Sequence, residues 1–309
     1  MNYPNDITDL LELSVRLGRN PLQVQASSGN TSIKLDGVLW IKASGKWLEK
    51  AREEDILVPL NLTEVRRELQ HGQHSFCTAT GSGTLRPSIE TAMHAVVPHR
   101  VVIHTHSVSA IAWAVRTDDA ERLAERLGGL RWQWIPYMPS GLPLARAIEQ
   151  ALTSSPATDV FVLANHGLVV CEEDCPSAER LLSLVETRLA VAPRCSAMGD
   201  PIDATSLRIL AAGTLYPCQA IFLGECLDQQ DLRFSSVGDR VTMLGRNLSE
   251  AQLAVLNGLL EVARRIPEDA PVRYLSSTEL AALKTPDSHA YKHDAELNGT
   301  RSNQRSLLV

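Results

Sequence analysis

Three histidines stand where apolar segments of this sequence end, and side chains at such positions can meet at a metal ion. His104 and His106 follow the apolar run 101–103, and His166 follows a second predicted strand, 159–164. Residues i and i+2 of a strand point the same way, so His104 and His106 can share a metal without distorting the chain. Three neutral imidazoles suit Zn²⁺, although another divalent metal is possible, and they leave a position open for substrate.

Glu90 is the acidic residue best placed to join these histidines. It lies fourteen residues before His104, near the start of a predicted helix over residues 88–97 that Ser88 can cap. A carboxylate beside Zn²⁺ stays ionised at neutral pH, and a helix N-terminus acts in the same direction. Glu90 is therefore predicted to be a fourth metal ligand, a general base, or both in turn. The alternative is that His104 and His106 only cap a strand and His166 a turn.

Polar turns near these residues offer a place for an anion. Residues 27–32 form a small polar turn with one glycine, and Ser44 and Gly45 form a second turn. Arg86 and Ser88 precede the Glu90 helix, whose N-terminus can accept a phosphate or carboxylate. Ordinary turn chemistry is the alternative explanation of each feature taken alone.

Hydrophobic periodicity predicts the elements that must position these side chains. An Asp-Gly pair between two apolar runs is a strong hairpin signal, and helical spacing alternates with short apolar runs along the rest of the chain. The predicted elements are a helix at 6–18, a hairpin at 33–43, a helix at 88–97, a strand at 101–103, a helix through 111–115, a helix at 143–153, strands at 159–164 and 168–171, and a helix at 177–191. Hairpins mixed with strand–helix alternation predict an α/β core with a mixed sheet.

The sequence also predicts a division of the chain. Residues 1–204 form the catalytic domain, and residues 205–309 form a smaller α+β extension of unassigned role. The extension has strand-like runs at 220–223 and 241–244, and capping boxes at Ser249 and Ser276 that begin two helices. The polar tail after Asn298 is predicted to be mobile.

Composition limits the classes of partner. The chain has 309 residues, with 30 basic and 36 acidic side chains and a net charge of −6, which argues against nucleic acid or an acidic membrane surface as a partner. The N-terminus lacks the pattern of a signal peptide, and no apolar stretch approaches the roughly 18 residues of a membrane span. Six cysteines in a chain of this length do not indicate a disulfide scaffold. A cytoplasmic protein acting on a small molecule is expected.

Taken together, the motifs resemble the class II aldolase/adducin family of zinc-dependent sugar-phosphate enzymes. The resemblance covers roughly residues 6 to 195, in the family's order, and rests on Ser28-Gly29-Asn30-Thr31-Ser32, Ala43-Ser44-Gly45, Pro87-Ser88-Ile89-Glu90, His104-Thr105-His106 and Asn165-His166-Gly167. It implies a three-layer α/β/α fold and a homotetramer with active sites between subunits.

The resemblance also implies roles for individual residues. The three histidines would bind zinc, and Glu90 would ligate the metal or act as base. The substrate phosphate would be bound by the two glycine turns and the serine before Glu90, which here are Gly29, Asn30, Ser44, Gly45 and Ser88. The ligand would be a sugar phosphate or a sugar acid.

Two departures from the family pattern concern the same segment. Ile89 stands where fuculose-phosphate aldolases have a second serine, which removes one phosphate contact. The segment 87–91 is closer to the aldolase half of bifunctional rhamnulose-phosphate aldolase/dehydrogenase proteins. That branch tends to have aspartate at the Glu90 position, and its dehydrogenase half is absent from these 309 residues.

The function expected from these observations is carbon–carbon cleavage of a ketose 1-phosphate or a related sugar or sugar acid through a metal-stabilised ene-diolate. Glu90 would move the proton at the enediolate carbon, and Tyr137 is a candidate for the proton on the aldehyde oxygen, although its neighbours favour a packing role. A 4-epimerase, a sugar-acid decarboxylase or a dehydratase could use the same ligands. A non-enzymatic adducin-like scaffold is disfavoured, because adducin-type heads lack the zinc histidines.

Overall fold

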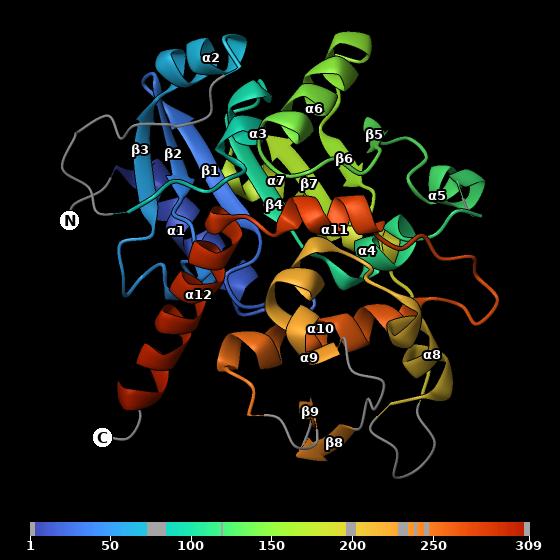
Figure 1. Ribbon diagram of the computed structural model, residues 1–309. Helices are drawn as coiled ribbons and strands as arrows, with labels where there is room; N and C mark the ends of the chain where they lie inside the picture. Colours follow the sequence, from blue (N-terminus) through green and yellow to red (C-terminus); the bar gives the residue numbers. More distant parts are fainter. Residues whose placement is uncertain are drawn as a thin grey trace.

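A mixed sheet forms the centre of the molecule (Figure 1). The computed structural model describes residues 4–72, 85–118, 120–195, 202–227, 234–237, 240–243 and 247–305. Its seven-stranded sheet has the order β3 (Leu57–Asn61), β2 (Val38–Lys42), β1 (Asn30–Leu35), β4 (Val101–Thr105), β7 (Gly167–Glu172), β6 (Val160–Leu163), β5 (Trp132–Ile135). Only β5 and β6 pair in parallel, so the predicted mixed α/β sheet is confirmed.

Helices cover both faces of this sheet. Strand β4 shows why both faces need cover: Val101 and Ile103 point into one core and Val102 into the other, and all three are buried. One layer contains α1 (Asn5–Gly18), α4 (Val108–Ala114), α5 (Ala120–Arg126) and α7 (Cys175–Leu189). The other contains α2 (Leu62–Gln70), α3 (Thr91–Val96) and α6 (Leu142–Ser154). The single-turn helix η1 (Leu48–Lys50) packs beside α1.

The C-terminal segment packs against the free side of α4. It contains α8 (Ala204–Ala212), the π-helix η2 (Gln219–Leu223), α9 (Gly224–Leu227), the hairpin β8 (Phe234–Val237) and β9 (Arg240–Met243), α10 (Glu250–Arg265), α11 (Ser277–Leu283) and α12 (Pro286–Arg305). Ile111 of α4 and the C-cap residue Val115 share one core with Val255 and Leu259 of α10. Helix α4 is therefore buried from two sides. Within the described ranges, no helix has the length and apolar character needed to cross a membrane.

Two sequence predictions need correction here. Residues 220–223 form the π-helix η2 rather than a strand, because a short apolar run fits a buried helix equally well, and Phe222 and Leu223 pack in the α10 core. The helix predicted at 88–97 begins only at Thr91. Helix α12 extends past Asn298 as far as Arg305, and the mobility of this tail stays a prediction.

Other predictions in the C-terminal segment are confirmed. The capping boxes at Ser249 and Ser276 begin α10 and α11, with both reciprocal hydrogen bonds present. The strand-like run at 241–244 corresponds to β9 as far as Met243, and residue 244 lies outside the described residues.

Glu186 of α7 gives a stability prediction for this packing. Its carboxyl group hydrogen-bonds to Ser107, the N-cap of α4, and lies near Arg265 of α10; burial raises its pKa to about 7. The folded protein thus keeps a proton that the unfolded chain releases near pH ~4.3. The resulting contribution to stability is full below that pH and is lost as pH rises through about 7.

Glu186→Gln should flatten this pH dependence and make the protein more stable than wild type at pH ~8, by roughly 1–3 kcal/mol. Urea unfolding across pH ~4–8 measures it. Glu179→Gln is the matched control, since Glu179 lies on the same helix in an exposed pair with Arg16. Parallel pH profiles for wild type and Glu186→Gln would contradict this account of Glu186.

Candidate metal centre

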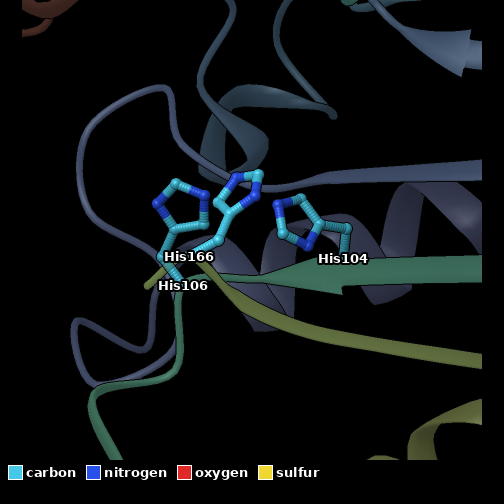
Figure 2. Close-up of side chains that lie close together, drawn as sticks. All are labelled: His104, His106 and His166. Atoms are coloured by element: carbon cyan, nitrogen blue, oxygen red, sulfur yellow. The ribbon is translucent and has the colours of Figure 1, made fainter. Parts of the chain in front are cut away.

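Strand pairing brings the three histidines together. Strand β4 ends in His104 and Thr105, and its antiparallel partner β7 places Val169 opposite His104. His166 lies in the turn immediately before β7, so its ring reaches the same place as His104 and His106. The ring centroids are 5.0, 4.9 and 5.1 Å apart (Figure 2).

The turn that carries His166 is fixed from two directions. Asn165 has the left-handed backbone conformation, with φ 51°, and its side chain donates hydrogen bonds to the carbonyl oxygens of Leu215 and Arg273. Gly167 is packed against β4 so closely that an added Cβ would lie 2.3 Å from the Thr105 carbonyl oxygen. The C-terminal segment therefore helps to position a histidine of the N-terminal sheet.

The hydrogen bonds of His104 define which ring nitrogen faces the cluster. Nδ1 lies 3.0 Å from the carbonyl oxygen of Leu168, which can only accept, so Nδ1 carries the proton. Nε2 of the neutral ring is then an acceptor, and it is buried without a hydrogen-bond partner. A buried lone pair without a partner is costly for a protein and is suited to a cation.

Burial also sets the charge state of the cluster. It lowers the pKa of His104 and, more strongly, the pKa of His106, so these rings favour the neutral form that binds metals. One nitrogen from each of the three histidines lies within 4.8 Å of the other two. The donor set therefore fits a divalent cation of the kind that prefers imidazole.

Glu90 faces the same cluster from the start of α3. Its two carboxylate oxygens lie 3.4 Å from His104 Nε2 and 3.2 Å from His166 Nε2. Asn30 Nδ2 donates to one oxygen at 2.7 Å and Ser140 Oγ donates to the other at 3.2 Å. Burial alone would raise the pKa of Glu90, but the facing imidazoles of His104, His166 and His106 bring it well below its ordinary value. The group is an oriented, buried carboxylate.

His94 is a fourth buried histidine close by, and its contacts separate it from the cluster. Its Nδ1 pairs with Ser32 Oγ at 2.7 Å, and its Nε2 pairs with the side-chain oxygen of Asn30. Both ring nitrogens are thus occupied, whereas His104 keeps one available. His94 orients Asn30, which in turn orients Glu90.

The predicted Ser44–Gly45 turn lies beside the segment that leads to Glu90. Ser44 N donates to the Arg86 carbonyl at 2.8 Å, and Ser88 N donates to the Lys42 carbonyl at 3.2 Å, so the segments 42–44 and 86–88 run together. Ser88 Oγ accepts hydrogen bonds from Asn30 Nδ2 and from the Glu90 amide.

Both turn glycines are required by their conformation and by their neighbours. Gly29 has φ 64° and Gly45 has φ 72°, which disfavours any other residue. A Cβ at Gly29 would lie 2.7 Å from the His104 carbonyl oxygen. Gly29, Asn30 and Ser88 therefore lie at Glu90 and the end of β4, while Ser44 and Gly45 adjoin Arg86 and the segment that leads to Ser88.

Lys42 was missed by the sequence analysis and joins these turns. Its ammonium is buried and donates to the carbonyl oxygens of Ser27 at 2.8 Å and Lys46 at 2.7 Å. Burial lowers its pKa to about 7. The available signal was a lysine at the end of the otherwise apolar run 38–41.

The C-terminal segment adds two further residues to the cluster. Tyr216 presents its ring to His106, with centroids 6.4 Å apart, and its hydroxyl is buried without a partner. Cys218 Sγ lies 3.5 Å from His106 Nδ1. Tyr137, the tyrosine singled out from the sequence, instead lies beside Arg273, whose guanidinium is 5.3 Å from its ring, and burial raises its pKa to about 12.

Comparison with known proteins supplies the family. The model of the class II aldolase and adducin N-terminal domain matches residues 8–192, more than half of the chain. The chain belongs to this family. The C-terminal segment from α8 onward lies beyond the matched residues.

Individual relatives agree with this assignment. L-fuculose phosphate aldolase of Methanococcus vannielii is 30% identical over 159 residues, which make up 47% of this chain and 73% of that protein. The uncharacterized oxidoreductase YuxG of Bacillus subtilis is 27% identical over 202 residues, 59% of this chain, and this chain spans only 29% of its length. The N-terminal class II aldolase domain of a Thermoplasma acidophilum protein shares the fold, with a TM-score of 0.52 at 23% identity, over 61% of this chain and 94% of that one.

Replacing single histidines tests the metal centre. His104→Ala removes the available Nε2 and should weaken zinc affinity by more than roughly 100-fold, while His94→Gln should change it by less than about tenfold. Zinc competition with a chromogenic chelator measures both. Equal losses in the two variants, with both proteins folded by circular dichroism, would show that the three-histidine assignment is wrong.

Proposed function

We propose that this protein is a zinc-dependent aldolase that cleaves a carbon–carbon bond in a sugar or sugar acid. The observation that carries the proposal is the buried cluster of His104, His106 and His166 with Glu90 held against two of the rings, in a chain of the class II aldolase and adducin family. A bound divalent cation would polarise the substrate oxygens and stabilise the negative charge left by cleavage.

Glu90 is proposed to transfer the proton at the carbon that becomes the enolate. The carboxylate is kept ionised and is aimed by Asn30 and Ser140, so it is available as a base at neutral pH. Asn30 is itself aimed by His94 and Ser88. These hydrogen bonds from side chains fix the orientation of the carboxylate.

The buried nitrogen of His104 distinguishes the proposed enzyme from a non-catalytic scaffold protein. A non-catalytic head would gain nothing from a buried His104 nitrogen that lacks a hydrogen-bond partner, because such a group costs stability. The same arrangement is useful if a cation occupies it. Zinc content near zero in the purified protein would favour the scaffold role.

Glu90→Gln is the most direct test of the chemistry. It keeps the shape and the hydrogen bond from Asn30 but removes the base, so cleavage should fall by roughly 10²–10⁴-fold. Zinc content, measured alongside, should stay near that of wild type. Ser140→Ala is the matched control, since it removes a contact to Glu90 but leaves the carboxylate. Unchanged turnover in Glu90→Gln would remove Glu90 from the mechanism.

A pair of tyrosine variants identifies the proton donor to the aldehyde oxygen. Tyr216 lies against His106, whereas Tyr137 lies against Arg273. Tyr216→Phe should therefore lower the turnover number by roughly 10–100-fold and Tyr137→Phe by less than about threefold. The reverse order would restore the role first assigned to Tyr137 from the sequence.

Product analysis separates the aldolase from other reactions on the same ligands. Cleavage yields two carbonyl fragments, while 4-epimerisation keeps the carbon skeleton, decarboxylation releases carbon dioxide and dehydration releases water. A panel of phosphorylated and unphosphorylated sugars and sugar acids, assayed with and without a chelator, provides the measurement. Full activity in metal-free protein would contradict the proposal.

A further inference from the structure

Helix α12 lies across the turn that was predicted to bind phosphate. Trp47 Nε1 donates to the Ala295 carbonyl at 2.9 Å, and Asn298 Nδ2 donates to the Gly45 carbonyl at 3.1 Å. A Cβ added at Gly45 would lie 2.3 Å from the Cβ of Asp294. Figure 1 shows α12, in red, descending beside the blue N-terminal part of the chain. The turn is therefore covered by a helix of the same chain.

Helix α12 places the carboxylate of Asp294 against the guanidinium of Arg86. Asp294 Oδ2 accepts a hydrogen bond from the Arg86 guanidinium at 2.7 Å. The Asp294 side chain also packs against the Gly45 turn. A negative charge from the protein thus stands where an anionic substrate group would need a positive one.

The other cations of these turns are also engaged by protein groups. Lys42 donates to the Ser27 and Lys46 carbonyls, and Lys50 donates to the Asn298 carbonyl. Lys46 pairs with Glu54 at 2.7 Å and with the Asn298 side-chain oxygen at 3.3 Å. A dianionic group arriving here would have to take a cation away from an existing partner while facing Asp294.

The strength of the Arg86–Asp294 ion pair determines how Asp294 affects the binding of an anion. Both side chains are partly exposed, at 46% and 37%, and ion pairs of this kind are weak and exchangeable. The pair does not lock the site shut. It lowers the affinity for an anion relative to a neutral polar group, and the Asp294 carboxylate can itself accept hydrogen bonds from hydroxyl groups.

We propose that Asp294 is a specificity-determining residue that selects against a phosphate at the Gly45–Arg86 end of the site. The substrate class is then a sugar or sugar acid that presents a hydroxyl group there and is unphosphorylated at that end. Naming this class rests on the proposed aldolase function, but the selection against phosphate does not.

Binding of inorganic phosphate to the zinc-loaded full-length protein tests the proposal without any catalysis. Titration calorimetry compares wild type with Asp294→Asn, which keeps the shape and removes the charge. The variant should bind phosphate at least roughly fivefold more tightly than wild type. Any phosphate bound directly at the metal is common to both proteins, so the difference reports on Asp294.

Two further variants define the result. Glu296→Gln removes the same charge from the same helix at a carboxylate that accepts a hydrogen bond from Ser249, so its phosphate affinity should match that of wild type. Arg86→Met added to Asp294→Asn should abolish the gain, because the cation that Asp294 pairs with is then missing. If Asp294→Asn fails to fold, Asp294→Ser serves in its place.

The possible outcomes separate the two proposals. Equal phosphate affinity in wild type and Asp294→Asn, or an equal gain in Glu296→Gln, would overturn the role of Asp294. The ratio of kcat/KM for a matched pair of sugars, unphosphorylated over phosphorylated, should be above one in wild type and fall in Asp294→Asn. Absence of cleavage with every sugar would count against the aldolase alone, since the calorimetric result stands without it.

Discussion

The antiparallel pairing of β4 with β7 is the constraint on which the site depends. It brings two strand ends to one place, and the register sets His104 beside the turn that carries His166. Because the strands lie in the middle of a sheet covered on both faces, the three rings are withdrawn from water. The lowered pKa values of His104 and His106 and the unpartnered nitrogen of His104 all follow from this burial.

A second consequence of burial is that every polar group around the rings needs a partner. Asn30 shows how this is met, since its amide contacts Glu90, Ser88 and His94 together. Lys42 meets the same need for the carbonyl oxygens of two adjacent turns. These contacts stiffen the surroundings of Glu90, which suits a group whose orientation matters for proton transfer.

The sequence predicted much of the sheet and the cluster of three histidines because those signals are local. The alternating apolar runs, the Asp-Gly turn and the His104/His106 spacing are each read from a short stretch of neighbouring residues. What it could not predict depends on contacts between residues far apart in the chain. Cys218 and Asn298 come to the site from the C-terminal segment, and no hydrophobic periodicity in the sequence indicates such packing. The strand predicted at 220–223 was wrong for a related reason, because packing in the α10 core determines the secondary structure of this run.

The burial of α4 from two sides has a consequence for how the chain acquires its structure during synthesis. The residues that match the family domain are made first, and they include Ile111 and Val115, which pack against Val255 and Leu259. Until α10 has left the ribosome, that apolar face of α4 has no cover, and such faces promote association between chains. The growing polypeptide therefore passes through a stage in which its sheet can form while α4 still exposes an apolar face.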